Sequence, residues 1–457
     1  MAMVELDEEK WAAQQFGTCQ LGDRRRTRRL VEFAAQVAAA PDANTPTQAE
    51  EWSDLKAAYR LIEEEDVTFD GIVEPHWQQT RRRESGTWLI ISDTTEINFG
   101  ATNQAAGLGP LGRGQGRGFL LHSGLMIDPK TEEVIGLAGQ KIRYRQPVPK
   151  NESRTAKLAR DRESRIWGAL IEQIGPPPAG VRWVQVCDRG ADNFEVYCQL
   201  LLNRQDWVIR VARLNRMVQH RGREMPLKNY LRLLPLAGTY ELSYRSKDHG
   251  PRTAHIEVRF GTVAVPAPRQ KSPWLREQGI TLICMNVVEV REVDAPAGVT
   301  PLHWVLFTSL PVATFEDSWT VIEYYEKRPV VEDFHKALKT GCRVEERQYE
   351  TAPRLEAITG LLCVVAVRLL QLRCAARQTP ERPAAEVVPH DWVIVLSGLR
   401  GGRRILTVRD FFRQLAGLGG HLLRKCDGEP GWITLWRGFE KLHLALRGFR
   451  VQRRKCG

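Results

Sequence analysis

The sequence predicts an α/β protein whose strand-rich middle part is flanked by helical segments at both ends. Residues 1–70 are helical by composition, and the chain then changes to short apolar runs separated by turn residues, up to about residue 315. Helical character returns after this point, and apolar residues again fall at helical spacing over 432–447. We therefore expect two helical modules around a sheet-forming core.

The order of elements in the first part of the core indicates its fold. Strands are predicted at 87–95, 119–128 and 132–144, followed by a helix over 155–173 and a strand over 181–188. Aspartates stand at the ends of the first and last of these strands. Three strands, a helix and a strand with carboxylates at strand ends predict the early part of an RNase H-like fold.

The rest of the chain divides into three further parts. Residues 206–315 contain short β-type segments separated by Pro/Gly-rich turns, which predicts a β-rich insertion in the core. Helices are expected over 316–340 and 353–376, and a linker or irregular segment over the proline-containing residues 377–398. The apolar stripe over 432–447 favours a packed or dimer-forming helix, and a purely intramolecular core explains it equally well. The predicted domains are an N-terminal helical domain, a catalytic core with the insertion and a C-terminal helical domain: 1–70, 71–374 and 375–457.

The charge of the chain indicates a polyanionic partner. Its 457 residues carry 66 Lys+Arg against 55 Asp+Glu, a net charge of +11. Arginine dominates the basic clusters at 24–29, 81–83 and 451–455, and its guanidinium binds phosphate in a bidentate manner. A solvated basic surface is the alternative explanation, which composition alone does not reject.

Other composition features exclude several classes of protein. The nine cysteines include no C-x-x-C pair, which argues against a zinc knuckle or ribbon. The N-terminus lacks the apolar region of a secretory signal, and the apolar run at 361–367 is too short to span a membrane. We expect a soluble cytoplasmic protein.

Three acidic residues are candidates for a metal site. Asp93 and Asp188 each follow a strand, and Glu332 lies on a predicted helix over 329–340. Two carboxylates on neighbouring strands and one on a packed helix can hold two divalent cations for an in-line phosphoryl displacement. Mg²⁺ prefers such oxygen ligands. A single Asp at a strand end is more often a turn or cap residue, so each acid alone carries little weight.

The helix that carries Glu332 presents further polar residues. His335, Lys336 and Lys339 follow at i+3, i+4 and i+7 and are expected to share its face. An ordinary solvated helix face would have the same pattern, and His335 could equally be a hydrogen-bonding residue at the edge of the core. Apolar residues are expected to pack inward from the opposite face: Val331, Phe334 and Leu338.

Residues 325–341 resemble the Y-x2-R-x3-E-x6-K motif of the IS-four-type bacterial insertion-sequence transposases, which move DNA by cut and paste. Tyr325, Arg328, Glu332 and Lys339 fill the four motif positions. The SDTT segment and the VCDRGAD segment resemble the family's two aspartate segments, and LGDRRRTRRL resembles its N-terminal DNA-contacting segment. The resemblance extends along most of the chain.

This resemblance implies a catalytic mechanism and a set of partners. It implies an RNase H-like core with a β-strand insertion and two Mg²⁺ ions per active site, for which Mn²⁺ can substitute. The partners would be double-stranded DNA, at the transposon ends and the target, and a second protomer in a homodimeric synaptic complex. It further implies a hairpin intermediate, and a bacterial cytoplasmic, nucleoid-associated protein without a membrane partner.

Trp304 matches the family's tryptophan that stacks on a base flipped out of the duplex. Trp304 shares a strand face with Leu302 and Leu306, so a core position is the alternative. Pro329 indicates that the helix of Glu332 begins there, which would place Tyr325 and Arg328 on a preceding helix or kink.

Eleven residues are the predicted DNA contacts. The five N-terminal arginines cannot all face one way on a helix, so two or three of them are expected to reach DNA. Helix-surface ion pairing is the alternative for the motif residues. The predicted DNA contacts are Arg24, Arg25, Arg26, Arg28, Arg29, Arg210, Trp304, Tyr325, Arg328, Lys336 and Lys339.

Two other functions remain open at this point. One is an RNase H-like nuclease or resolvase without strand transfer, against which the long insertion and the arginine module argue. The other is a catalytically inactive, transposase-derived DNA-binding protein, against which the presence of all three acids argues.

Overall fold

The computed structural model places most of the chain. It describes residues 7–49, 51–112, 114–145, 162–246, 250–378, 380–424 and 430–456, together with 151, 153 and 156.

The centre of the molecule is a mixed sheet that begins with the predicted core strands. β1 pairs with β3 in antiparallel orientation and with β5 in parallel orientation, and β6 continues the sheet parallel to β5. The RNase H-like α/β fold class expected from the sequence is confirmed. The core strands are β1 (Gly86–Asn98), β2 (Gly109–Leu111), β3 (Gly116–Ile127), β4 (Val134–Arg143), β5 (Val181–Cys187) and β6 (Asp206–Arg210).

The β-rich insertion extends this same sheet. β12 pairs with β6, and the strand order continues through β11, β10 and β7 to β8 at the edge, so the core and the insertion share one sheet. β6 begins at the residue where the insertion was expected to start, yet its parallel pairing makes it a core strand. The insertion strands are β7 (Met217–His220), β8 (Arg223–Pro226), β9 (Gly238–Ser246), β10 (Gly250–Pro266), β11 (Leu282–Val293) and β12 (His303–Thr308).

The N-terminal module is helical, as expected. Asp23 caps α2 by accepting a hydrogen bond from the Arg25 amide, and Thr68 caps α5 in the same way through the Gly71 amide. α5 crosses the expected boundary at residue 70 and packs against β4 and α13. The helices are α1 (Glu8–Phe16), α2 (Arg24–Ala39), α3 (Thr45–Gln48), α4 (Trp52–Glu63) and α5 (Phe69–Arg81).

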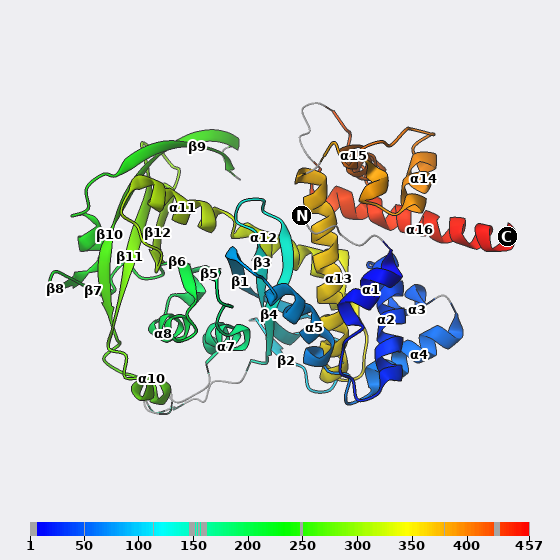
Figure 1. Cartoon of the computed structure of the whole chain (residues 1–457), viewed down its shortest axis with the longest axis horizontal. Coiled ribbons are helices and arrows are strands. Elements are labelled where there is room, and N and C mark those ends of the chain that lie inside the picture. Colours follow the sequence, from blue (N-terminus) through cyan, green and yellow to red (C-terminus); the bar gives the residue numbers. More distant parts are fainter. Residues whose placement is uncertain are drawn as a thin grey trace.

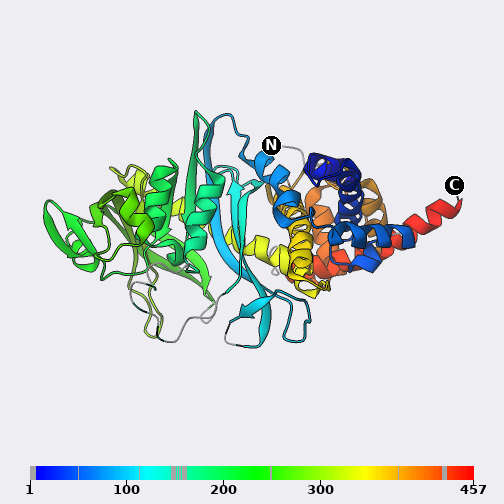
Figure 2. The same ribbon diagram turned by 90° about the horizontal axis from the view of Figure 1, so that it is seen from below.

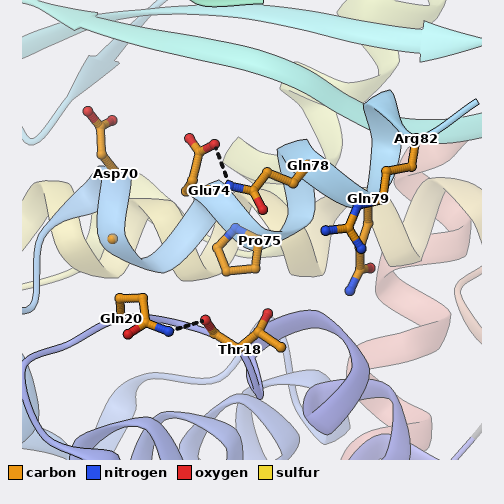
Figure 3. A pocket seen from close by; sticks show the side chains of 9 residues that line it. Thr18, Gln20, Asp70, Glu74, Pro75, Gln78, Gln79 and Arg82 are labelled. Atoms are coloured by element: carbon orange, nitrogen blue, oxygen red, sulfur yellow. Dashed lines mark hydrogen bonds between the residues drawn. The ribbon is translucent and has the colours of Figure 1, made fainter. Parts of the chain in front are cut away.

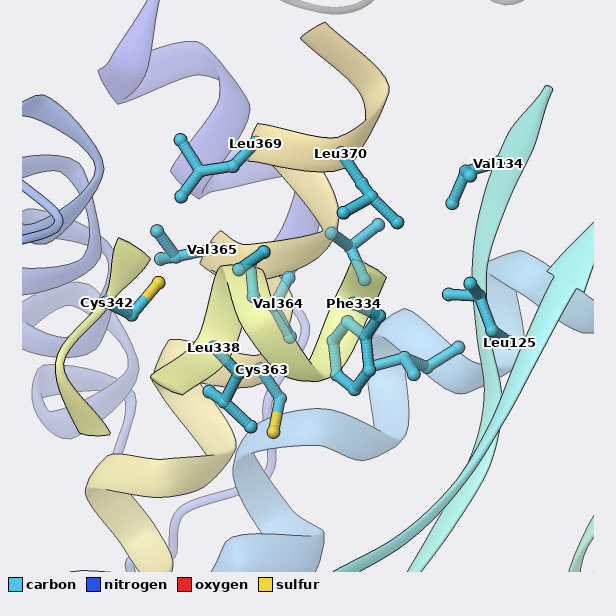
Figure 4. Packing of buried hydrophobic residues seen from close by; sticks show 14 of the residues in the cluster. Leu125, Val134, Phe334, Leu338, Cys342, Cys363, Val364, Val365, Leu369 and Leu370 are labelled. Carbon is cyan, nitrogen blue, oxygen red and sulfur yellow. The ribbon is translucent and has the colours of Figure 1, made fainter. Parts of the chain in front are cut away.

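The helices after the insertion support the sheet from one side. Phe334 and Leu338 are fully buried, and Figure 4 shows Phe334 between the helix that carries Val364 and the strands that carry Leu125 and Val134. These helices are α11 (Phe315–Glu326), α12 (Pro329–Lys336) with a π-helical turn over Ala337–Gly341, and α13 (Ala352–Gln378).

Helix α13 is a core helix. Its segment Ala352–Cys374 is long and apolar enough to cross a membrane, but 89% of its most apolar window is buried inside the protein. It contacts α2, α4 and α5 of the N-terminal module and α15 of the C-terminal part. Burial within this structure therefore explains its apolar sequence.

Small helices complete the core and the insertion. The helix expected over 155–173 is α7 (Arg165–Ile174), which packs on β3 and β4, whereas residues 157–161 lie outside the described part. Gly175 ends this helix with a positive φ of 72°. The other helices are α8 (Phe194–Leu202), α9 (Leu227–Leu231) and α10 (Pro273–Gln278).

The C-terminal part is a helical unit. The expectation of a linker or irregular segment over 377–398 was wrong for its end, because α14 (His390–Leu399) begins directly after Pro389. Trp392 and Leu396 are buried and α14 contacts α16, so apolar packing outweighs the proline signal. The other helices are α15 (Val408–Leu418) and α16 (Trp432–Cys456).

The apolar stripe of α16 faces its own chain. Leu435, Phe439, Leu442 and Leu446 are buried against α14 and α15, which supports the intramolecular alternative for these positions. Seen in two directions, the N- and C-terminal helices gather at one end of the molecule and the insertion forms the other end (Figures 1 and 2). The core strands lie between them.

Candidate active site

The parallel pairing of β1 and β5 brings two of the predicted acids together. Ser92 lies opposite Cys187 in this pairing, so the next residues, Asp93 and Asp188, lie side by side. Asp188 follows the end of β5 as expected, whereas Asp93 lies within β1, which continues to Asn98, so its expected position at a strand end was wrong. The Thr94 amide donates to Asp93 Oδ1 at 2.7 Å. Two neighbouring carboxylates are thereby fixed at one end of β5.

Asp188 is also held by local structure. It stands directly after β5, at the start of a 3-10 turn over Arg189–Ala191, and its Oδ1 accepts the Gly190 amide at 2.7 Å. The same residue is thus a helix cap and one of two adjacent acids. This hydrogen bond leaves the second carboxylate oxygen, Oδ2, for other partners.

Arg328 joins the third acid to the first. Its Nη1 lies 3.4 Å from Asp93 Oδ2, and its Nη2 donates to Glu332 Oε1, one helical turn further along the chain. The side chains of Arg328 and Asp93 are about one-fifth exposed, whereas that of Glu332 is 45% exposed. One guanidinium therefore bridges residues that are 235 and 4 positions away in the sequence.

The electrostatics of Asp93 reflect this crowding of acids. Burial raises the pKa of Asp93 to about 6, and the charges of Asp188 and Glu332 add to the rise. The Thr94 amide and the Arg328 guanidinium act in the opposite direction. Three neighbouring carboxylates repel one another unless a positive charge lies nearby, and in the structure Arg328 supplies this charge.

The three acids are suitable ligands for a divalent cation, although their side chains do not point to one common position. Among the described residues, no three Asp, Glu, His or Cys side chains lie close enough together to hold a metal ion. Arg328 stands between Asp93 and Glu332 and binds both. Carboxylate oxygens are what Mg²⁺ prefers, so these three acids fit such an ion once Arg328 releases one of them.

The helix that carries Glu332 begins where the sequence indicated. Pro329 is the first residue of α12, and its missing amide is no loss there. Tyr325 lies in the last turn of α11, and Arg328 stands at the junction of the two helices. This break is what allows the side chain of Arg328 to reach Glu332 and Asp93 together.

His335 does not share the exposed face of Glu332, so that expectation was wrong and the alternative of a position at the core is supported. It is buried because α12 packs against β1 and β3, and its pKa is lowered to about 3, mainly by burial. Lys336 is exposed and lies 3.7 Å from Asp333. Lys339 lies 3.2 Å from Glu345 and is about one-third exposed.

An aromatic cluster lies beside the acids. Trp304 is half-buried, and its ring meets that of Tyr325 edge-on, with 5.4 Å between centroids. Burial raises the pKa of Tyr325, whereas a hydrogen bond from Arg210 lowers it and the charge of Asp188 raises it further. Arg210 also donates to the His303 carbonyl at 3.1 Å. The fold thus brings Arg210, Trp304 and Tyr325 next to Arg328 and the acids.

The N-terminal arginines divide into two groups. Arg26 is bound to its own chain, with ion pairs to Asp66 at 2.6 Å and to Glu64, and a hydrogen bond to the Leu21 carbonyl. The other four are exposed on the first turns of α2: Arg24, Arg25, Arg28 and Arg29. Arg25 pairs with its neighbour Asp23 at 2.8 Å and remains 84% exposed.

Sequence reasoning missed His122 as a neighbour of the acids. It is fully buried on β3, and its Nδ1 lies 2.8 Å from the hydroxyl of Thr94, the residue after Asp93. Its ring also meets Trp167 at 4.4 Å. A histidine within the otherwise largely apolar run FLLHSGLM was the signal that could have identified it.

A separate hollow lies on the N-terminal side of the core. Its volume is about 560 Å³, and it lies between α5 and the connection from α1 to α2 (Figure 3). Burial raises the pKa of Asp70 on its wall, and Glu74 accepts a hydrogen bond from Gln78 at 3.1 Å. None of the predicted site residues lines it.

Comparison with protein families identifies both functional parts of the chain. Residues 8–67 match a family described as transposase DNA-binding, and residues 158–368 match one described as transposase DDE domain. The chain carries the two domains of a DDE transposase. The DDE match contains Asp188 and Glu332, whereas Asp93 precedes it. A DDE domain implies that this transposase depends on a divalent metal and acts on DNA.

One solved transposase complex shows low similarity to this chain. A piggyBac transposase synaptic complex with hairpin DNA, solved by cryo-EM, is 10% identical, with a TM-score of 0.37. The match covers 96% of this chain and 81% of that one. Similarity at this level carries no information about the site.

Proposed function

We propose that this transposase cuts DNA at the ends of its own element and joins the freed ends to target DNA, with Asp93, Asp188 and Glu332 as its metal ligands. The observation that carries the proposal is the placement of two acids side by side on parallel strands and the linking of the third to them through Arg328. Two Mg²⁺ ions bound there, or Mn²⁺ in their place, would stabilise the attacking and leaving oxygens of an in-line displacement.

The protein's own groups position the DNA for this reaction. Arg328 is held between two acids, so when it is released its guanidinium is placed to bind the phosphate next to the cut. Lys336 and Lys339 lie further along the same helical segment. Lys336 is exposed, Lys339 is about one-third exposed and their carboxylate partners are half-buried, so solvent weakens both ion pairs. These cations can exchange a protein carboxylate for a DNA phosphate.

We further propose the IS-four-type pathway with a hairpin on the transposon end. The Tyr325, Arg328, Glu332 and Lys339 spacing supports it, and so does the position of Trp304. The Trp304 indole is half-buried and packs edge-on against Tyr325, and an unstacked base is proposed to stack on its exposed part. Arg210, beside the Tyr325 hydroxyl, adds positive charge at the same place.

The remaining parts of the proposal concern DNA ends and assembly. Arg24, Arg25, Arg28 and Arg29 are exposed on α2 and are proposed to bind the phosphates of the terminal repeat. A homodimer that pairs two ends in a synaptic complex is proposed from the family resemblance. Helix α2 with these arginines lies within residues 8–67, the segment that matches the transposase DNA-binding family.

One experiment separates this function from its alternatives. The purified transposase is mixed with a linear duplex that carries the inverted repeats bordering its gene, a target plasmid and Mg²⁺. Excised ends joined to the plasmid support the proposal, and cleavage without joining would indicate a nuclease. Binding without any cleavage would indicate an inactive DNA-binding protein, in which the Arg328 bridge holds the acids permanently.

A further inference from the structure

A second concentration of positive charge lies at the far end of the insertion, away from the acids. Between residues 213 and 232 the chain has six Arg or Lys residues and a single acid, Glu224. All but Arg216 of these cations are exposed, and within the described residues none of the exposed ones pairs with a carboxylate. We call the exposed ones the distal basic patch: Arg213, Arg221, Arg223, Lys228 and Arg232.

The tip of the patch is a tight hairpin turn. β7 and β8 pair through His220 and Arg223, which leaves Arg221 and Gly222 as a two-residue loop with φ of 49° and 74°. Two positive φ angles define the type I′ turn, in which Asn, Asp or Gly is preferred at the first position. Arg221 occupies that position at the cost of backbone strain that Asn or Gly would relieve. A guanidinium is thereby presented at the outermost point of the hairpin.

Hydrogen bonds join the segments that carry the other patch residues to one another and to β10. The Lys228 amide donates to the Leu214 carbonyl at 2.9 Å, which joins the start of α9 to the loop that carries Arg213. Tyr230 donates through its hydroxyl to the Thr262 carbonyl at 3.0 Å and anchors α9 on β10. The backbone that carries the patch is therefore fixed by hydrogen bonds to the rest of the insertion.

Arg216, in the same segment, differs from the patch residues because it is bound within the protein. It turns inward, pairs with Asp192 at 2.7 Å and lies 5.9 Å from the centre of the Phe307 ring. Its side chain is 17% exposed. The five patch residues have no such carboxylate partner among the described residues, so their charge is available to an external anion.

The patch lies on the opposite side of the acids from the N-terminal module. β8 is six strand steps from β5 in the sheet order, so a path along the sheet is about 29 Å at about 4.8 Å per strand. Figures 1 and 2 show the insertion and the N-terminal helices at opposite ends, with the core strands between them. A straight duplex covers this path with roughly 8 base pairs at about 3.4 Å each.

We propose that the distal basic patch binds the phosphate backbone of the donor DNA that flanks the element, beyond the cleavage site. This rests on the proposed function. Before cleavage the flanking duplex is continuous with the end held at the acids, so it is present there at high local concentration. Exposed Arg and Lys side chains that outnumber the neighbouring acids bind phosphates and read no sequence, which suits flanking DNA of arbitrary sequence.

The test compares two duplexes in the absence of divalent metal. One ends at the cleavage site of the terminal repeat, and the other continues for about 20 base pairs of arbitrary sequence, more than the patch requires. Anisotropy measured from about 50 to 200 mM salt gives the salt dependence of binding. For the wild type, the flank should steepen the log–log slope by about 2, since each phosphate contact contributes about 0.9.

Three double variants with equal charge loss decide the result. Arg221→Gln/Arg223→Gln should abolish most of the increment from the flank and leave binding of the short duplex unchanged. Arg403→Gln/Arg404→Gln, which removes two exposed arginines from the C-terminal part, should keep the whole increment. Lys228→Gln/Arg232→Gln should reduce it as well, which keeps the test valid if the hairpin variant does not fold.

Three results bear on the proposal differently. A full increment in both patch variants would overturn it. Normal flank binding with lost joining of pre-cut ends to a target plasmid would assign the patch to target DNA and would also overturn it. If the wild type cuts neither duplex with Mg²⁺, the proposed function fails, and the slope comparison still decides whether the patch binds flanking DNA.

Discussion

Replacing Arg328 by Ala tests the bridge between the acids. At 3.4 Å, a unit charge pair in surroundings with an effective dielectric constant of about 20 interacts with about 5 kcal/mol. Desolvation of Arg328 and Asp93 offsets most of this, and the 45% exposure of Glu332 screens the other contact. We expect a net loss of about 1–2 kcal/mol in the free energy of unfolding when metal is absent.

The decisive readout is the effect of Mg²⁺ on this loss. In Arg328→Ala the acids repel one another without a counter-charge, so Mg²⁺ should stabilise the variant by more than it stabilises the wild type. Urea denaturation with EDTA and with Mg²⁺ measures both quantities. Arg373→Ala is the matched control, because Arg373 pairs with Asp333 at 2.9 Å and not with the three acids.

The comparison of Arg328→Ala with Arg373→Ala shows whether the effect of Mg²⁺ is specific to the three acids. Arg373→Ala should also lose stability, and Mg²⁺ should not restore it beyond its effect on the wild type. If Mg²⁺ stabilises Arg328→Ala no more than it stabilises Arg373→Ala, then Arg328 and the metal do not share the acids.

Three further predictions concern cleavage, DNA binding and the hairpin. Asp188→Asn should abolish strand cleavage in a gel assay and leave end binding intact, and Mg²⁺-dependent nicking by this variant would remove Asp188 from the site. Arg25→Gln/Arg29→Gln should flatten the salt dependence of end binding by up to about 0.9 per contact, whereas Arg26→Gln should lower thermal stability. Equal slopes in the three proteins would show that the cluster is only solvated surface. Trp304→Ala should allow first-strand nicking but slow hairpin formation, and Trp304→Phe should recover part of the rate, since stacking tolerates the ring type. An insoluble Trp304→Ala protein would support a core role.

The parts of the site that could be predicted depend on local pattern. Asp93 and Asp188 each follow an apolar run of a strand, and the parallel pairing of the two runs places the acids together. Pro329 marks the start of α12 because proline is favoured in the first turn of a helix and disruptive within it. In each case, neighbouring residues in the sequence contain the physical cause.

The parts that could not be predicted depend on distant partners. The contact of Arg328 with Asp93 spans 235 positions, and that of Arg26 with Asp66 spans 40, so no local pattern reveals either. His335 is polar but faces the sheet, and its helical spacing from Glu332 could not decide between the exposed face and the edge of the core. Tertiary packing decides such cases.

The most direct test of the three-acid assignment is the metal preference of Asp93→Cys. A thiolate binds Mg²⁺ poorly and binds the softer Mn²⁺ better, so the metal dependence of cleavage reports on what this side chain holds. If Asp93 is a metal ligand, the variant should fail to cut element ends in Mg²⁺ and should recover part of its cleavage in Mn²⁺. Cleavage in Mg²⁺ at the wild-type rate would contradict the account.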